Sequence, residues 1–175
     1  MTEEVSQPEP AAEPPPTPAP ASPPSPTFPH ALFAVGSMRF GLPIASVGEV
    51  VSEMSLTRLP HASRGLLGIV NLRGEILPAA TLQPWFGEEA AAASTNLFLV
   101  VRASASAIAL RIDRFEQVVP VPQNGLHPDE EPGLRAEVAP QIWQRPAGNV
   151  HCLSADALFE ALKTKKSQPE ENPVA

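Results

Sequence analysis

Arg73 is the residue whose type and position best suit it to bind another molecule. It lies in the segment Gly68–Pro78, where an apolar run reaches a polar Asn-Leu-Arg-Gly corner and a second apolar run then begins. Two apolar runs joined by a glycine-containing corner predict a β-hairpin with Arg73 at its tip. A guanidinium on a rigid turn can bind a partner's carboxylate through two parallel hydrogen bonds. The nearest acid in the sequence is Glu75, and from the residues alone a solvated turn arginine stays open.

Catalytic and metal-binding residues do not form a recognisable pattern in this sequence. The single cysteine, Cys152, is adjacent to His151, but neighbouring residues of a strand point to opposite faces, which disfavours a nucleophile–base pair. We therefore expect Cys152 to be a buried, small apolar residue. There is no Cys-x-x-Cys or His-x-x-x-His spacing and no glycine-rich phosphate loop. We expect no catalytic residue, no metal and no cofactor, and a hydrolase that uses Cys152 is a minor alternative.

The first half of the sequence contains short strands that would position Arg73. Ala31–Val35 and Arg39–Leu42 predict a hairpin, and Ser46–Val51 predicts a third strand. Ser63–Leu67 is expected to form one helical turn. Many short strands with turn residues between them are typical of a barrel or a sandwich.

The second half continues this pattern and ends in a helix. We expect a second strand group, made of Asn96–Val101, Ala107–Ile112 and Gln117–Val121. Gln123–Glu137 is predicted to be a long polar loop. Ser154 is a plausible N-cap for a closing helix at Ala155–Leu162, which carries apolar residues on one face.

Composition divides the chain into three segments. Of its 175 residues, 23 are proline, and many of these lie among Ala, Glu, Ser and Thr in residues 1–29. Such a segment has too little apolar bulk to offset the entropy lost on ordering, so we expect a disordered arm, either a passive tether or a partner-binding segment. Residues 30–162 are expected to form one compact domain, and residues 163–175 a flexible polar tail.

Charge and hydropathy exclude several classes of function. The formal net charge is −7, and no stripe of basic residues is present, so the positive field that nucleic acid requires is missing. The amino terminus lacks the basic and apolar regions of a signal peptide, and no apolar run approaches the length needed to cross a bilayer. We therefore expect a cytoplasmic protein without direct membrane insertion and without nucleic acid as a partner.

Several segments together resemble the CheW family, the scaffold proteins of bacterial chemotaxis arrays. The resemblance covers roughly residues 30–162, and its most specific element is Gly-Ile-Val-Asn-Leu-Arg-Gly. The matching segments are Phe33–Ile44, Val47–Val51, Leu56–Pro60, Gly68–Leu82, Asn96–Val101 and Ala109–Val119. The resemblance implies a mainly β fold with two small five-stranded SH3-like barrels packed together, and short helices that include one at the C-terminus.

The resemblance also implies which residues bind partners. In the family, the residues that match Val47, Glu49, Gly68 and Arg73 lie where receptors and the kinase regulatory domain dock. Val47 would supply apolar contact, Glu49 charge complementarity and Arg73 a polar anchor, while Gly68 would allow close backbone approach. From spacing alone, Val47 and Glu49 share a face of the predicted strand, although Val47 in the core and Glu49 in solvent is an open alternative.

Other polar residues are expected to have structural roles. Asn71 and Gly74 would stabilise the turn at Arg73, and Asp113 would accept hydrogen bonds in a turn after a strand. The sequence departs from the family near Thr81, where an acidic residue is common. The hydroxyl of Thr81 can still accept a hydrogen bond.

The implied function is that of a non-enzymatic adaptor in a chemosensory signalling array. Its partners would be the cytoplasmic tip of a methyl-accepting chemoreceptor and the regulatory domain of a CheA-type histidine kinase, in membrane-associated receptor arrays. The alternative is a small β-barrel module that binds a ligand or nucleic acid. Such a module requires a basic aromatic face, whereas Tyr is absent and aromatic residues make up 5% of the chain.

Overall fold

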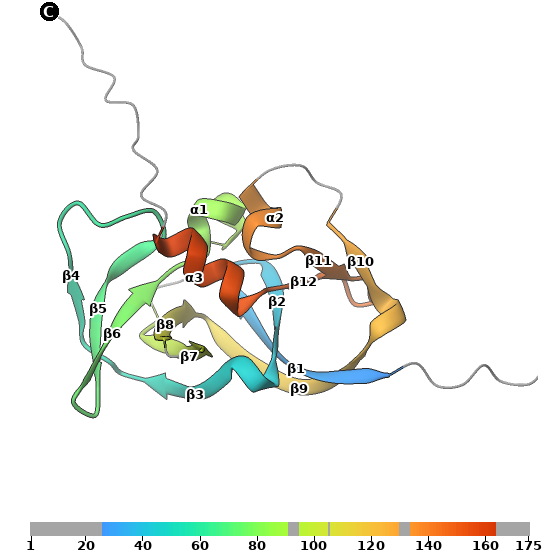
Figure 1. Cartoon of the computed structure of the whole chain (residues 1–175), viewed down its shortest axis with the longest axis horizontal. Helices are drawn as coiled ribbons and strands as arrows, with labels where there is room; N and C mark the ends of the chain where they lie inside the picture. Colours follow the sequence, from blue (N-terminus) through green and yellow to red (C-terminus); the bar gives the residue numbers. More distant parts are fainter. Residues whose placement is uncertain (1–25, 91–94, 105, 130–133, 164–175) are drawn as a thin grey trace, which may run out of the picture.

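The computed structural model describes residues 26–90, 95–104, 106–129 and 134–163. Within these residues the strands form two six-stranded sheets, sheet A and sheet B (Figure 1). Sheet A, in spatial order, consists of β10 (Leu126–Pro128), β11 (Gln141–Trp143), β12 (Val150–Cys152), β2 (Met38–Pro43), β1 (Thr27–Val35) and β9 (Arg114–Pro122). Sheet B consists of β3 (Val47–Ser52), β7 (Leu97–Ala103), β8 (Ser106–Ile112), β6 (Glu75–Ala80), β5 (Leu66–Leu72) and β4 (Leu56–Arg58).

Sheet A joins strands from the two ends of the described chain. β1 forms the expected hairpin with β2, and on its other edge it pairs with β9 from Thr27 opposite Pro122 to Ala34 opposite Arg114. Sheet B is built from the strands between them, β3 to β8. The expectation that β7, β8 and β9 form one strand group is therefore wrong. Residues 30–35 of β1 are all buried, so this strand needs neighbours on both edges, and β9 supplies the second one.

A shared hydrophobic core holds the two sheets together. It includes Phe33 of β1, Phe40 of β2, Leu99 of β7 and Leu110 of β8, all fully buried. A second, smaller cluster lies within sheet B around Phe98. The expected mainly β fold with two packed units and a C-terminal helix is confirmed. The units have six paired strands in the described residues rather than five, because the short strands β4 and β10 add to the sheet edges.

Short helices close the junction between the sheets. They are α1 (Gln83–Phe86), α2 (Leu134–Val138) and α3 (Ala155–Lys163), with 3-10 turns η1 (Ile44–Ser46), η2 (Gly87–Ala90) and η3 (Gln123–Gly125). Figure 1 shows α3 lying across the middle of the molecule, with α1 and α2 beside it. Ser154 Oγ accepts a hydrogen bond from the Ala157 N–H at 3.3 Å, as expected of an N-cap. No helix in the described ranges is long and apolar enough to span a membrane.

Two local predictions are wrong. Ser63–Leu67 does not form a helical turn: the Leu66 N–H bonds to Ser63 O at 3.0 Å in a turn, and Leu66 already begins β5. Gly65 has φ +79°, which ends any helical conformation at that point. Gln123–Glu137 is not a continuous loop, because η3, β10 and most of α2 lie in it. Burial of Val138 against the shared core stabilises α2 in a segment of mostly polar sequence.

The expected boundaries of the domain lie close to the edge of the described region. Residues 1–25 of the predicted arm and residues 164–175 of the predicted tail lie outside the described residues. Thr27–Pro29 belong to β1, and Lys163 is the last residue of α3. The two prolines Pro29 and Pro120 lie opposite each other at the outer end of the β1–β9 pair, where missing N–H donors disturb the ladder least.

Gly68 lies in β5 opposite Arg58 of β4, its antiparallel neighbour. A Cβ atom at this position would lie 2.1 Å from the backbone oxygen of Thr57, and its φ of +157° is unfavourable for other residues. The register of β5 against β6 shifts between Leu66 and Gly68, which marks a β-bulge. Glycine is therefore required at residue 68 by the packing of β5 against β4 within this protein.

Cys152 is a packing residue in β12. Its side chain is buried, and burial raises the pKa of the thiol from 9.0 to about 11, against a weaker lowering effect from a backbone hydrogen bond at Trp143. A thiol with this pKa is protonated at neutral pH and is a poor nucleophile. The expectation of a small apolar role for Cys152 agrees with this environment.

The raised pKa of Cys152 predicts a pH dependence of stability. The folded thiol holds its proton up to about pH 11, whereas the unfolded thiol loses it near pH 9. The unfolded state therefore binds fewer protons in this window, so the free energy of unfolding should fall by up to about 3 kcal/mol as the pH rises through it. Urea titrations at several pH values measure this slope. Equal slopes for the native chain and Cys152→Ala would contradict the assignment.

Gly68→Ala should be strongly destabilising. We expect a loss of about 2–4 kcal/mol in the free energy of unfolding, because the new methyl group collides with the backbone of β4 and the backbone angle is strained. Gly148→Ala is the matched control, since Gly148 has φ +108° but nothing within 4 Å of its Cβ position. Similar losses for the two variants in urea titrations would show that backbone strain alone, and not the collision, requires glycine at residue 68.

Candidate functional site

The tip of the β5–β6 hairpin holds Arg73 in a strained, well-defined turn. Leu72 pairs with Glu75, so Arg73 and Gly74 are the two loop residues, with φ of 52° and 93°. Positive φ at both loop positions is the type I′ geometry that matches the twist of a hairpin. The Gly74 N–H donates to Asn71 Oδ1 at 2.7 Å. The turn thus fixes the backbone from which the guanidinium projects.

Arg73 pairs with Glu49 of β3 and not with Glu75. Its two terminal nitrogens donate to the two carboxylate oxygens of Glu49 at 2.9 and 3.3 Å, a bidentate geometry. The Arg73 side chain is 78% exposed and that of Glu49 is 34% exposed. Glu49 lies in a β-bulge, because the register of β3 against β7 shifts between Val47 and Val50. A bulge changes the direction in which a side chain points.

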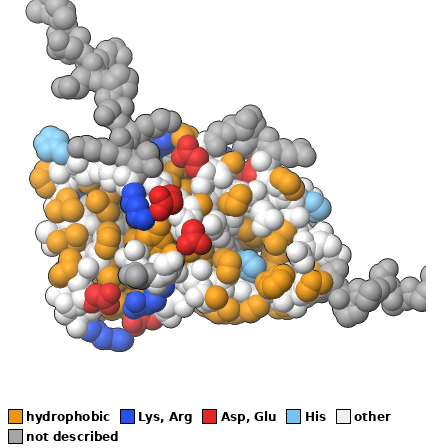
Figure 2. All heavy atoms as spheres, viewed as in Figure 1, with side chains coloured by type: hydrophobic (Ala, Val, Ile, Leu, Met, Phe, Trp, Pro, Cys, Tyr) orange, Lys and Arg blue, Asp and Glu red, His pale blue; other side chains and the backbone are white. Residues whose placement is uncertain are grey.

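A second ion pair lies at the same end of sheet B. Arg102 of β7 approaches Glu75 of β6 at 3.9 Å, and its Nε lies 3.2 Å from the Cβ position of Gly48. We name Glu49, Arg73, Glu75 and Arg102 the rim cluster. Figure 2 shows acidic and basic side chains gathered at the lower left, where the β5–β6 hairpin ends in Figure 1.

Apolar residues neighbour the rim cluster along strands β3 and β6. Val47 is half-buried and packs against the shared core, so its side chain only partly faces solvent. The β-bulge between Val47 and Val50 interrupts the alternation of faces along β3, so spacing alone does not place Val47 and Glu49 on one face. Val50 of β3 and Ile76 of β6 are large apolar side chains that are exposed. Exposed apolar side chains therefore follow the charged residues Glu49 and Glu75 directly in the sequence.

Arg73 has most of the hydrogen-bond donors that the site can offer to a partner. A guanidinium has five N–H donors, and two of those on Arg73 bond to Glu49, so others face solvent. The rim cluster contains two acids and two arginines and has no net formal charge. It can therefore accept a carboxylate from a partner without requiring a strongly charged partner surface.

Asp113 and Thr81 have structural environments away from this rim. Asp113 Oδ2 accepts the Gly36 N–H at 2.5 Å, and its own N–H donates to Ala34 O at 2.9 Å, so it ties the β1–β2 turn to the β8–β9 connection. Thr81 Oγ1 accepts the Gln83 N–H at 3.3 Å at the start of α1. The hydroxyl of Thr81 therefore accepts a hydrogen bond, as expected.

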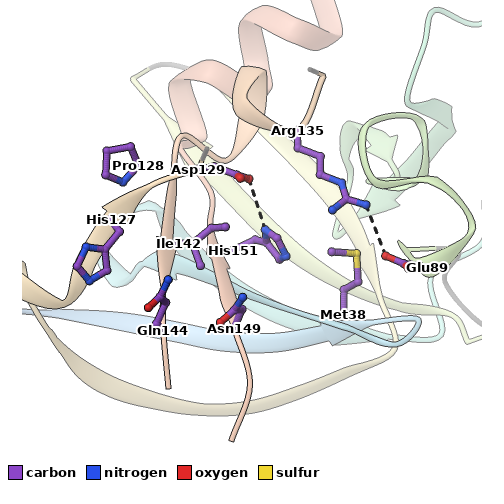
Figure 3. A pocket seen from close by; sticks show the side chains of 10 residues that line it. All are labelled: Met38, Glu89, His127, Pro128, Asp129, Arg135, Ile142, Gln144, Asn149 and His151. Carbon is purple, nitrogen blue, oxygen red and sulfur yellow. Dashed lines mark ion pairs between the residues drawn. The ribbon is translucent and has the colours of Figure 1, made fainter. Parts of the chain in front are cut away.

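A polar pocket of about 470 Å³ lies on the sheet A side of the molecule (Figure 3). The buried carboxylate of Asp129 lies 3.8 Å from His151 Nδ1, and Arg135 of α2 pairs with Glu89 of η2 at 3.5 Å. The His151 ring packs edge-on against Phe86. Each of the two acids therefore faces a nitrogen of a neighbouring side chain within the pocket.

The pocket does not have the residues of a metal site or of a nucleophilic active site. Among the described residues, no group of three or more His, Cys, Asp and Glu side chains could hold a metal ion. Cys152 follows His151 in β12 but does not line the pocket. The rim cluster is therefore the better candidate for function.

Sequence analysis predicted two residues of the rim cluster, Glu49 and Arg73, as docking residues, but it did not predict how the cluster is arranged. Glu49 and Arg73 were expected as separate docking residues, and their direct pairing is a finding of the structure. Arg102 was not singled out, and its only signal was a charged residue near the end of an apolar strand. The pocket was also missed, because its lining residues come from segments far apart in the sequence.

Comparison with known proteins identifies the family. A family model described as the CheW-like domain matches residues 29–163. The chain is 30% identical over 100 residues to the chemotaxis protein CheW of Helicobacter pylori, which covers 57% of this chain and 61% of that protein. It is 27% identical over 136 residues to the probable chemotaxis protein CheW of Rhizobium etli, covering 76% and 88%. The protein FrzA of Myxococcus xanthus is 36% identical over 74 residues, covering 41% and 46%.

The match to the Helicobacter protein spans under two thirds of that relative, and the same is true of CheW from Rhizobium meliloti, of which 63% is covered. Among solved structures, the scaffolding protein TtCheW of Thermoanaerobacter tengcongensis has a TM-score of 0.65 at 24% identity, covering 73% of this chain and 89% of that one. This likeness establishes the fold of two packed SH3-like units. The chain therefore belongs to the CheW-like domain family.

Proposed function

We propose that this chain is an adaptor that couples a chemoreceptor to a CheA-type histidine kinase in a chemosensory array. The rim cluster would provide the polar part of its docking surface, with Arg73 as the anchor. The observation that carries this proposal is the bidentate Arg73–Glu49 pair, held at an exposed turn of the family scaffold. Such a pair fixes the guanidinium before binding, so less side-chain entropy is lost when a partner docks.

The environment of each residue supports a specific part in docking. Glu49 orients Arg73, and Gly68 keeps β4 close against β5 behind the hairpin. Val47 supports β3 from the core side, while Val50 and Ile76 offer exposed apolar contact. Receptor and kinase would then meet on one rigid β scaffold, and a change of receptor state would reach the kinase as a change in docking.

A nucleic-acid-binding module is the weaker alternative. The rim cluster is electrically balanced, and the whole chain carries a formal net charge of −7. Nucleic acid binding requires lysine and arginine in excess to replace counterions on the phosphates. The exposed rim does not supply that excess.

Arg73→Ala should weaken partner binding and leave the fold intact. We expect a loss of about 1–3 kcal/mol in binding free energy for a chemoreceptor tip fragment or the kinase regulatory domain, as for interface anchors. The free energy of unfolding should change by less than about 1 kcal/mol, because the ion pair is exposed. Calorimetric titration and urea unfolding of the same samples measure the two quantities.

Arg73→Lys is the matched control that separates the effect of positive charge from the effect of guanidinium geometry. Lysine keeps the positive charge but cannot form the bidentate contact, so binding should also be impaired. If a folded Arg73→Ala protein binds both partners as tightly as the native chain, the assignment of Arg73 as the anchor is wrong.

Glu49→Lys should impair binding more than Glu49→Gln does. Lysine at this position would place a like charge beside Arg73 and displace its guanidinium, whereas glutamine would still accept a hydrogen bond. The expected order of affinity is native, Glu49→Gln and then Glu49→Lys, measured with the same partner fragments. Equal affinity for the two variants would mean that Glu49 does not orient Arg73.

A further inference from the structure

The ion pair of Glu75 and Arg102 is not explained by the stability of the fold. Its closest N–O distance is 3.9 Å, and the side chains of Arg102 and Glu75 are 50% and 54% exposed. Loose pairs of exposed side chains contribute little to folding free energy, because solvent screens the attraction and ordering costs entropy. Both side chains can therefore exchange their mutual contact for contacts with a partner.

The position of this pair links it directly to the Arg73–Glu49 pair. Glu75 follows Arg73 by two residues across the hairpin turn, and the Arg102 guanidinium lies over Gly48, the residue before Glu49. The charges thus alternate around the rim in the order Glu49, Arg73, Glu75, Arg102. The two pairs form one surface pattern, although they come from β3, β6, β7 and a turn.

We propose that Glu75 and Arg102 set the choice of partner at the docking surface. The inference rests on the proposed adaptor function. The partner that fits is a protein surface with a carboxylate opposite Arg73, a basic residue opposite Glu75 and a second carboxylate opposite Arg102. A related surface with one of these charges reversed would place like charges together.

The balance of charge argues for selectivity more than for affinity. The rim cluster has no net formal charge, so it gives no long-range attraction to a partner of one sign. Each native contact would replace an existing contact within the cluster, and the net gain is small. A mismatched charge gains nothing and adds repulsion, which rejects the wrong partner.

The test compares two partners and two double variants. The probes are soluble chemoreceptor tip fragments, one from the organism that encodes this chain and one from Helicobacter pylori. Glu75→Gln/Arg102→Gln removes both charges at nearly constant size, and Glu75→Arg/Arg102→Glu reverses them. Glu160→Lys/Lys163→Glu is the control, since it reverses another exposed pair, at 2.8 Å on α3. Calorimetric titration gives the affinity of each protein for each fragment, and thermal unfolding gives its stability.

The neutral variant should keep its affinity for the cognate fragment within about threefold and lower the cognate-to-non-cognate affinity ratio by about tenfold. The reversed variant should bind the cognate fragment about tenfold more weakly, and the α3 control should behave as the native chain. If the native chain and the neutral variant have the same affinity ratio, while Arg73→Ala weakens binding, the selectivity role is wrong and the adaptor function stands. If the native chain binds neither the receptor fragments nor the kinase domain, both proposals fail. Should the reversed variant unfold, the neutral variant alone decides.

Discussion

The burial of β1 on both edges is the constraint on which the rest of the structure depends. Its residues 30–35 are buried, and the strand lies between β2 and β9, so its backbone groups are paired on each side. A strand in this position can be satisfied only if a segment far along the chain returns to it. That return brings β10 to β12 and α3 onto the same framework and creates the core shared by the two sheets. Sheet B is then held as a stable base from which the β5–β6 hairpin projects.

Local sequence was sufficient to predict most of the elements that carry the candidate site. The hairpin around Arg73 follows from apolar runs, Asn71 and Gly74, whose requirements act within a few residues. The closing helix follows from Ser154 and the apolar residues after it. These signals are local, so they can be recognised in the sequence without knowledge of the fold. The short helix α2 was not predicted from local sequence. Its main stabilising contact is the burial of Val138 in a core that other segments form.

Long-range pairing was beyond the reach of pattern alone. The alternation in β9 identifies a strand but does not say that its neighbour is β1 instead of β8. In the same way, Glu49 and Arg73 could each be recognised as charged residues, yet their contact joins β3 to the β5–β6 turn, two segments that are not neighbours in the strand order of sheet B. Arg102 was harder still to recognise from the sequence. Its place in the rim cluster depends on its position beside Gly48, and a glycine has no side chain from which a contact could be predicted. The family resemblance supplied the docking residues that the physics of the sequence left open.

The division of sheet A between the two ends of the domain has a consequence for how the chain is made. Strands β3 to β8 are continuous in sequence, so sheet B can close as soon as residue 112 has left the ribosome. Sheet A cannot be complete until β12 has been synthesised, because β2 needs its parallel neighbour and β1 needs β9. During that interval β1 and β2 carry apolar residues that have no lasting cover. Contacts between distant segments also form slowly, so we expect the junction between the sheets to assemble last and its apolar residues to stay exposed longest during synthesis.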